Sequence, residues 1–273
     1  MFVLSLISLA IWCVLLAGRA GFWRVRKPGL APAPAQWPEV VAIIPARNEA
    51  DVIGGAVASV LGQAYPAALR LVVVDDHSTD GTADIARSAA AARARSAAAA
   101  LGKADALTVI TARDLPAGWS GKVWAQSEGL EAADNAAPGA GWVWLTDADI
   151  HHGDGVLAQL VARAAHEQRD LVSLMVRLRC ASWWERLIVP AFVFFFAKLY
   201  PFARVNNPHS GVAAAAGGCM LARRSALARI GGFAAIRGEL IDDCSLAACI
   251  KVSTWPTTAS PCAPTMTGAA CGT

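Results

Sequence analysis

Charged residues are scarce in this 273-residue chain: Asp, Glu, Lys and Arg make up 16% of it, whereas hydrophobic residues make up 55%. So low a charged fraction indicates contact with a membrane, although part of the hydrophobic excess is alanine, which favours helices. The formal net charge is only +3, which is too small to indicate nucleic-acid binding. We therefore expect no nucleic-acid partner.

Three common motifs are also missing. The seven cysteines form no C-x-x-C pair and have no regular spacing, so neither a zinc site nor a disulfide framework is predicted, and a reduced, cytosol-facing domain is expected. No two histidines have H-x-x-x-H spacing, which disfavours a histidine-based metal site. No G-x-G-x-x-G follows the first predicted strand, so the usual dinucleotide fingerprint is excluded.

The N-terminus carries one of two long apolar segments, with basic residues only after it. The apolar run at residues 2–17 precedes Arg19, and residues 1–23 reach the length of about 20 residues that a membrane span requires if Arg19 snorkels to the interface. A cleaved signal peptide would carry its charges before the apolar run instead. The positive-inside rule then places the rest of the chain in the cytoplasm, at the inner membrane. An amphipathic surface helix, or a start codon placed too early, is the alternative.

Composition divides the rest of the chain. Prolines mark residues 24–38 as a semi-rigid linker, and a folded domain is predicted for residues 39–250. Within it, residues 183–202 form the second apolar segment, predicted as an interfacial helix or re-entrant hairpin, with a buried core helix as the alternative. Residues 251–273 are rich in Thr, Pro, Ala and Cys without periodicity. They indicate a frameshifted or truncated tail, or a disordered tail in a shortened natural protein.

The predicted domain alternates short apolar runs with helical patterns, which implies a mostly parallel α/β sheet. Residues 213–221 read as small and flexible. The strands are expected at residues 40–45, 70–76, 106–110, 142–150 and 171–176. Helices are expected at residues 51–61, from residue 83 onward, from the loop at residues 115–122 through about residue 133, and at residues 156–167.

Acidic pairs follow two of these strands and open a later helix. Asp147 and Asp149 end the run that begins at Trp142. On an extended backbone both side chains would point the same way, at the sheet edge where ligands bind in open α/β folds. Two such carboxylates suit Mg²⁺ or Mn²⁺, whereas the alternative is a solvated turn. Asp242 could likewise be only a helix cap.

Four motifs in the same order resemble the family 2 glycosyltransferases, which have the GT-A fold. The resemblance covers roughly residues 40–250. It rests on Ile43–Glu49, on the V-D-D-x-S-x-D-G-T-like stretch at Val73–Thr82, on Asp147-Ala148-Asp149 and on Ile241-Asp242-Asp243. Trp119–Lys122, together with an N-terminal anchor, resembles the hopanoid-biosynthesis-associated branch. The GT-A fold is a Rossmann-like sheet flanked by helices, and we expect it here behind an N-terminal membrane helix.

The resemblance assigns roles to the residues at these motifs. It implies that Asp76 accepts the N–H of a uracil base, because an ionised carboxylate only accepts hydrogen bonds. It further implies that Lys122 lies near the diphosphate or the base, where a point positive charge is suited. The residues expected to line the nucleotide are Pro45, Arg47 and Glu49.

The remaining acids would act on the metal and in the reaction. By resemblance, Asp149 ligates Mg²⁺ or Mn²⁺, with Asp147 at the ribose or in the metal's coordination sphere, and the metal neutralises charge on the leaving diphosphate. Asp243 would be the general base of an inverting displacement. Asp242 stands where the family usually has Glu.

The expected function is therefore transfer of a sugar from a nucleotide-sugar donor to a lipid acceptor at the membrane. The resemblance implies a UDP-sugar as the donor and a place in hopanoid biosynthesis. The family's Q-x-x-R-W-type motif is absent after residue 250. A truncated, catalytically defective nucleotide-binding remnant is accordingly the alternative. A nucleotidyltransferase is disfavoured, because Pro45–Glu49 is not a Gly-rich phosphate loop.

Overall fold

The computed structural model describes residues 2–24, 29–98 and 106–254, and the chain divides into two compact units. The first, called the sheet unit below, comprises residues 30–175 and 215–273. The second, called the helical unit, comprises residues 1–29 and 176–214. The segment from Leu30 to Pro38, predicted as a linker, belongs to the sheet unit, where the Tyr65 hydroxyl donates to the Pro38 carbonyl at 2.5 Å.

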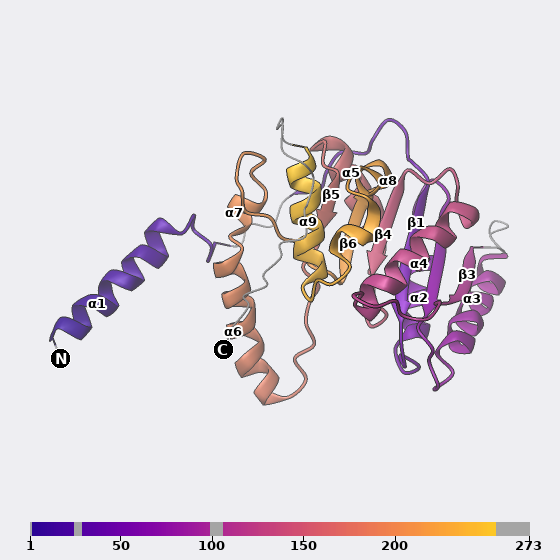
Figure 1. Cartoon of the computed structure of the whole chain (residues 1–273), viewed down its shortest axis with the longest axis horizontal. Coiled ribbons are helices and arrows are strands. Elements are labelled where there is room, and N and C mark those ends of the chain that lie inside the picture. The colour runs from indigo at the N-terminus through magenta and orange to yellow at the C-terminus, as the bar shows by residue number, and fades with distance from the viewer. Residues whose placement is uncertain (1, 25–28, 99–105, 255–273) are drawn as a thin grey trace, which may run out of the picture. The chain divides into compact units, whose positions relative to one another are not determined.

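The sheet unit is built on a six-stranded mixed sheet in the order β3-β2-β1-β4-β6-β5 (Figure 1). β1 pairs in parallel with β2 and β4, and β2 with β3, whereas β6 runs antiparallel to both β4 and β5. The strands are β1 (Val40–Ala46), β2 (Leu69–Asp75), β3 (Leu107–Thr111), β4 (Trp142–Thr146), β5 (Leu171–Ser173) and β6 (Cys219–Arg223).

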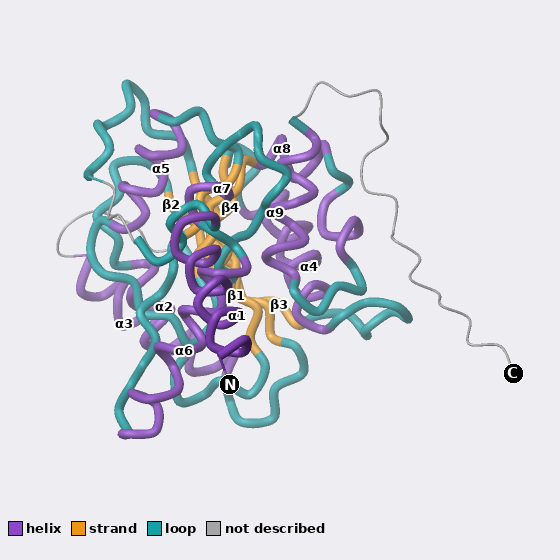
Figure 2. Tube along the Cα trace, turned by 90° about the vertical axis from the view of Figure 1, so that its left-hand side faces the viewer, coloured by secondary structure: helices purple, strands orange, loops and turns teal. Residues whose placement is uncertain are grey.

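Helices cover both faces of this sheet, as Figure 2 shows: α2, α3 and α5 lie on one face, and α4, α8 and α9 on the other. Their bounds are α2 (Ile53–Leu61), α3 (Thr82–Ala98), α4 (Gly121–Ala136), α5 (Val156–His166), α8 (Arg224–Arg229), the 3₁₀ turn η2 (Gly232–Ile236) and α9 (Asp242–Ser253). Because both faces are covered, the central strands are apolar throughout rather than alternating: residues 41–44 of β1 are fully buried.

The mixed α/β sheet flanked by helices agrees with the expected Rossmann-like fold, but three sequence predictions are wrong in detail. The segment expected to be flexible, residues 213–221, overlaps residues 219–223, which form the buried strand β6. The strand predicted for residues 142–150 ends at Thr146, so Asp147 and Asp149 lie in a turn rather than on extended backbone.

The third correction concerns the chain after residue 250. Lys251, Val252 and Ser253 complete α9 directly after the buried residues Cys249 and Ile250. The rest of the predicted atypical tail, residues 255–273, lies outside the described residues.

The helical unit joins two segments that are distant in the sequence. It contains α1 (Phe2–Cys13), the π-helical η1 (Val14–Gly18), α6 (Trp183–Leu199) and α7 (Phe202–Val205). The rings of Phe22 and Phe194 meet edge to face at 5.1 Å, and Arg19 Nε donates to the Lys198 carbonyl at 3.0 Å. A capping box, in which Ser182 and Glu185 each accept the other's backbone N–H, begins α6.

Among the described residues, one helix is long and apolar enough to cross a membrane, Trp183–Val205, whereas Phe2–Gly18 is apolar but shorter. This criterion concerns length and composition alone. The N-terminal anchor at residues 1–23 and the interfacial segment at residues 183–202 therefore stay predictions.

Candidate active site

The predicted site residues gather at one edge of the sheet. The parallel strands β1, β2 and β4 all end there, and β6, being antiparallel, begins there, with Thr146 paired to Cys219. β1 and β4 are neighbours from which the chain proceeds in opposite directions across the sheet. In open α/β sheets, ligands bind at such a switch point, outside the carboxyl ends of the strands.

The loops that follow β1 and β2 are joined by side-chain hydrogen bonds. Asn48 has a left-handed backbone with φ of 55°, which Asn tolerates better than most residues. Its backbone N–H donates to Ser78 Oγ at 2.9 Å, and its side-chain oxygen accepts the Thr79 N–H at 2.9 Å. Sequence reasoning missed this role, although Ser78 and Thr79 lie within the V-D-D-x-S-x-D-G-T-like stretch.

Two further residues of that stretch fasten the same loops. Thr82 Oγ1 accepts the Glu49 N–H at 2.9 Å, and Asp80 accepts the Ala50 N–H at 3.0 Å. The Thr82 hydroxyl also donates to Asp80. This bond, followed by the one from the Ala50 N–H, lowers the pKa of Asp80. The polar residues of the stretch thus fix the geometry of the loops that carry the predicted nucleotide-binding side chains.

Arg47 and Asp76, the predicted nucleotide-binding pair, contact each other across these two loops. Arg47 Nη1 lies 3.2 Å from Asp76 Oδ2. A Cβ at Gly121, the first residue of α4, would lie 3.5 Å from the same oxygen. Asp76 therefore lies beside the N-terminus of α4, where the positive end of a helix dipole favours anionic groups. Pro45 precedes this loop within β1 and is half-buried.

Lys122 connects the D-x-D turn to the acidic pair of α9. Its Nζ lies 2.7 Å from Asp147 Oδ1 and 3.8 Å from Asp242 Oδ2. Burial alone would lower the pKa of Lys122, but the charges of Asp147 and Asp242 outweigh it and raise the pKa. A protonated lysine thus lies between the D-x-D turn and the acidic pair of α9.

The two acids of α9 differ in their surroundings. Both oxygens of Asp243 accept backbone N–H groups, from Gly217 at 2.8 Å and from Cys244 at 2.7 Å. Among the described residues, Asp242 Oδ2 is buried without a hydrogen-bond partner. Burial, followed by the charges of Asp243 and Asp147, raises the pKa of Asp242 despite the opposing effect of Lys122.

The N-cap residue Ile241 has no side-chain capping bond, and Asp243 accepts the backbone N–H of Cys244 in the first turn of α9. Gly217 permits the close approach of the pair to β6, because a Cβ there would lie 3.3 Å from Asp243 Oδ2 and 3.5 Å from Lys122 Nζ. The structure therefore joins the acidic pair to the entrance of β6 and to Lys122, rather than leaving it as a solvated helix start.

Asp149 lies beyond Asp147 in the turn after β4 and is exposed. Glu49 approaches both: burial raises the pKa of Glu49, and the charges of Asp149 and Asp147 raise it further. Within the described ranges, no group of three or more His, Cys, Asp or Glu side chains could hold a metal ion by itself. Carboxylates of this kind still suit Mg²⁺ or Mn²⁺, ions that proteins often bind through one or two carboxylates together with substrate phosphates.

The buried His152 contacts Thr146, the residue directly before the D-x-D turn, a role that the sequence did not predict. His152 Nε2 lies 2.7 Å from Thr146 Oγ1, which donates to the Gly218 carbonyl at 3.0 Å. The backbone N–H of His152 donates to Ser59 Oγ of α2 at 3.1 Å, and the imidazole ring packs against Trp144. Burial lowers the pKa of His152 to about 4, so the ring is neutral at pH 7.

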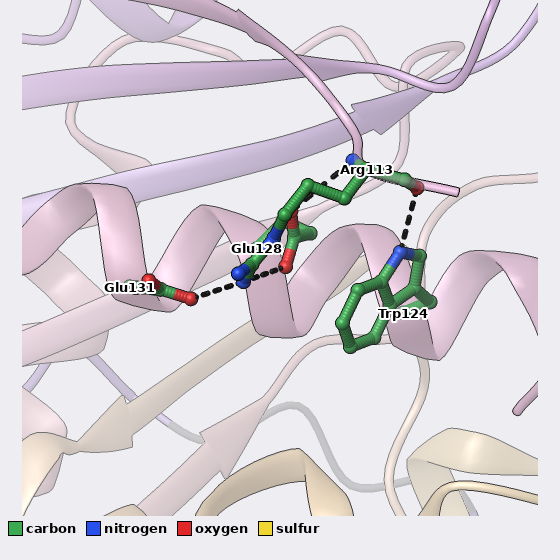
Figure 3. A network of polar contacts seen from close by, with 4 residues as sticks. All are labelled: Arg113, Trp124, Glu128 and Glu131. Carbon is green, nitrogen blue, oxygen red and sulfur yellow. Dashed lines mark hydrogen bonds and ion pairs between the residues drawn. The ribbon is translucent and has the colours of Figure 1, made fainter. Parts of the chain in front are cut away.

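A second unpredicted network holds the loop that leads into α4 and hence to Lys122 (Figure 3). Arg113 forms a forked pair with Glu128 at 2.8 and 2.6 Å and also contacts Glu131. Trp124 Nε1 donates to the Arg113 carbonyl at 2.9 Å. The Arg113 side chain is the main cause of the lowered pKa of Glu128. Three α4 residues, Trp124, Glu128 and Glu131, thereby hold Arg113 at the start of the loop.

Comparison with known families identifies the class of protein to which this site belongs. The family model described as "Glycosyl transferase family 2" matches residues 41–231, more than half of the chain. The chain belongs to glycosyl transferase family 2. None of the curated proteins matches it significantly.

The chain is also similar to solved structures, among them a mannosyltransferase and a mannosyl-3-phosphoglycerate synthase. The mannosyltransferase of Pyrobaculum calidifontis, in complex with GDP-Man and Mn²⁺, is 26% identical with a TM-score of 0.57, covering 88% of this chain and 61% of its own. Mannosyl-3-phosphoglycerate synthase from Rubrobacter xylanophilus is 20% identical with a TM-score of 0.43, covering 77% and 64%. The chain thus spans less than two thirds of the length of either protein.

Proposed function

We propose that this protein is a membrane-associated, inverting glycosyltransferase that moves a sugar from a nucleotide-sugar donor to a lipid acceptor. The observation that carries the proposal is the position of Lys122, 2.7 Å from Asp147 of the D-x-D turn and 3.8 Å from Asp242 of the acidic pair. Residues suited to a diphosphate and residues suited to deprotonate a hydroxyl thus lie side by side at the switch point of the sheet.

The nucleotide would lie over the ends of β1 and β2. There Asp76 accepts an N–H of the base, and Arg47, Glu49 and Pro45 line the nucleotide. The tie between the loops of Asn48 and Ser78 holds these groups in place before the donor arrives. Uridine was expected from the family resemblance, whereas the Pyrobaculum enzyme is described with GDP-Man, so both diphosphates belong in the test.

Asp149 and Asp147 would hold Mg²⁺ or Mn²⁺ together with the diphosphate oxygens, and the Pyrobaculum enzyme is described with Mn²⁺. When bound, the metal supplies charge neutralisation for the leaving diphosphate. Lys122 adds a positive charge beside Asp147, and it can turn toward the phosphates because its side chain is partly exposed. The exposed position of Asp149 leaves room for waters to complete the coordination of a metal.

In the transfer step, a carboxylate takes the proton of the acceptor hydroxyl as that oxygen forms a bond to the anomeric carbon. The bond from that carbon to the diphosphate oxygen breaks on the opposite side, so the configuration inverts. The family resemblance gives the base role to Asp243. Asp242 is the second candidate, because its Oδ2 is buried without a hydrogen-bond partner in the described structure.

A lipid acceptor and an inner-membrane location, with the sheet unit in the cytoplasm, are supported by the apolar helices of residues 2–18 and 183–205. In this proposal residues 1–23 anchor the chain. Hopanoid biosynthesis is the proposed setting, from the resemblance of Trp119–Lys122. Deleting the gene in its host tests this setting: loss of a glycosylated hopanoid supports it, and an unchanged hopanoid profile contradicts it.

Activity is tested with the full chain in detergent, supplied with Mn²⁺, a panel of UDP- and GDP-sugars and a total lipid extract. We expect metal-dependent release of nucleoside diphosphate and a labelled lipid product with one donor. Asp243→Asn serves as the inactive control that should still bind donor. Turnover of no donor by a folded protein that also binds neither UDP nor GDP would contradict the proposed function.

A further inference from the structure

The two units carry charges of opposite sign. The helical unit, residues 1–29 and 176–214, contains nine of the 24 Lys and Arg residues but only one, Glu185, of the 21 Asp and Glu residues, a formal charge of +8. The sheet unit therefore has 15 basic and 20 acidic residues, a formal charge of −5. The net charge of +3 conceals this separation of charge. Each unit attracts partners of the sign opposite to its own.

The helical unit also presents an apolar stripe. Trp184, Ile188, Phe192, Phe195 and Leu199 are spaced by four, four, three and four residues, the interval that places side chains on one face of a helix. Each of them is between 57 and 62% exposed. On the other side of α6, the Phe194 ring meets Phe22 and Ala197 is buried, although Trp183 and Leu187 beside the stripe are also exposed. The stripe is therefore the outward face of α6.

The basic residues lie at the two ends of this stripe. Arg177 and Arg179 precede α6, Arg186 lies in its first turn, and Lys198 and Arg204 lie at and beyond its end. The uncharged stretch between Arg186 and Lys198 covers about 16 Å of helix at 1.5 Å per residue, roughly half of the ~30 Å hydrocarbon core of a bilayer. This spacing fits a helix that lies along the surface of a membrane better than one that spans it.

Aromatic residues mark the start of the helix. Trp183 and Trp184 are stacked with ring centroids 3.6 Å apart, and both are more than half exposed. Tryptophan is enriched at the headgroup level of membranes, because its ring is apolar but carries an N–H donor. A helix with such anchors, an apolar face and Lys or Arg around it binds bilayers through buried apolar area and attraction to anionic lipids.

We propose that the helical unit binds the surface of a bilayer rich in anionic phospholipid, with the α6 stripe in the acyl boundary and its flanking arginines at the headgroup phosphates. This inference deepens the proposed function and rests on it for the view that the acceptor is a lipid. The separation of charge agrees with this choice of partner, because an anionic surface attracts the helical unit and repels the acidic sheet unit.

The test is flotation of the full chain with vesicles of phosphatidylcholine alone or of phosphatidylcholine and phosphatidylglycerol at 7:3. A basic residue near an anionic surface strengthens binding about fivefold, so we expect anionic vesicles to bind the chain at least tenfold more tightly at low salt. The preference should shrink in 0.5 M NaCl, since salt screens it.

Two variants with the same change in charge separate location from net charge. Substituting glutamine for four exposed arginines of the helical unit should remove most of the preference for anionic vesicles. The same substitution at four exposed arginines of the sheet unit should leave it intact. The first set is Arg177, Arg179, Arg186 and Arg204, and the second is Arg70, Arg87, Arg93 and Arg95.

A third variant, Trp184→Ser with Phe192→Ser and Phe195→Ser, should weaken binding to both kinds of vesicle. Equal losses in the two arginine variants, or equal binding of the unaltered chain to both vesicles, would overturn the proposal. A stripe variant that changes the oligomeric state but not vesicle binding would also overturn it, because the stripe would then join copies of the chain.

Metal-dependent binding of UDP and GDP is measured on the same samples, which distinguishes the two proposals. Nucleotide binding without anionic preference refutes the membrane inference alone. Anionic preference without nucleotide binding contradicts the glycosyltransferase function and leaves the membrane surface standing.

Discussion

In the sheet unit, the loops at the active-site edge are joined by hydrogen bonds from backbone N–H groups to particular side chains, whereas in the helical unit α6 exposes an apolar stripe. Asn48 and Ser78, or Asp243 and the Gly217 N–H, meet at 2.9 and 2.8 Å. Trp184 and Phe192, by contrast, are each more than half exposed.

This difference separates two kinds of sequence requirement. A hydrogen-bonded site depends on which atom each residue offers, so an Asp→Asn change that preserves volume can abolish its chemistry. An apolar surface depends on area, about 25 cal/mol for each Å² buried, so exchanges among large apolar residues should be tolerated. The predictions below test this contrast, beginning with the largest effect.

The acidic pair of α9 should show the strongest dependence on a single atom. Asp→Asn at the general base should lower kcat by roughly 10²–10⁴-fold, while donor affinity changes little. Steady-state kinetics and donor calorimetry on Asp242→Asn and Asp243→Asn identify the base as the position with the larger loss of kcat. Full activity in both variants would remove the pair from the mechanism.

The buried histidine beneath the D-x-D turn should make stability depend on pH. The pKa of His152 is about 4 in the folded protein and near 6.5 unfolded. Between these values the unfolded chain binds more protons, so stability is full above pH 6.5 and falls as the pH drops toward 4. The loss should reach roughly 3 kcal/mol, at 1.36 kcal/mol for each pKa unit.

Thermal or urea unfolding between pH 7 and pH 4.5 measures this loss. His152→Gln, which can still bond to Thr146, is the control and should lose less stability over the same range. Parallel profiles for the two proteins would show that His152 does not carry the dependence.

The Arg113 network provides a matched pair of substitutions on one helix. Glu128 is 5% exposed and Glu131 66%, although both contact Arg113. Glu128→Gln should cost roughly 1–3 kcal/mol of unfolding free energy, because it weakens buried, charge-assisted hydrogen bonds. Glu131→Gln should cost less than about 0.5 kcal/mol, as is usual for exposed ion pairs.

Because the pKa of Glu128 is lowered, its contribution is present above the unfolded value near 4.5 and disappears as the pH falls below it. Urea unfolding of the two variants at pH 7 and pH 4 measures both effects. An equal cost for the two substitutions at pH 7 would mean that burial does not decide the strength of this network.

The helical unit should show the smallest effect. Phe192→Leu combined with Phe195→Leu keeps most of the apolar area of the stripe, so vesicle binding should change by no more than about threefold. Flotation against the vesicles described above measures it. A loss as large as that of the serine variant would show that the stripe recognises a shaped partner rather than a lipid surface.

Much of the sheet and of its edge could be predicted from sequence because short-range patterns encode them. β1 and β2 are largely apolar runs of strand length that are followed by polar residues, and the loops after them carry residues that recur in the family. The positions of Arg47 and Asp76 on facing loops follow from parallel strand pairing.

The parts that could not be predicted depend on contacts between distant residues. β6 is buried over most of its length, so it lacks polar–apolar alternation, and it is a short run that begins among small residues. His152 acquires its role because β4 pairs with β6, which brings Thr146 to the Gly218 carbonyl. The helical unit combines residues 1–29 with residues 176–214, a pairing that hydropathy along the chain does not encode.

The most direct test of the account is calorimetry of UDP and GDP binding to the full chain, with and without Mn²⁺, beside an Asp149→Ala variant. We predict that one nucleotide binds more tightly with Mn²⁺ and that the variant loses this gain while keeping its fold. A folded protein that binds neither nucleotide, or an Asp149→Ala variant with an undiminished Mn²⁺ effect, would contradict the assignment of the D-x-D turn as the donor site.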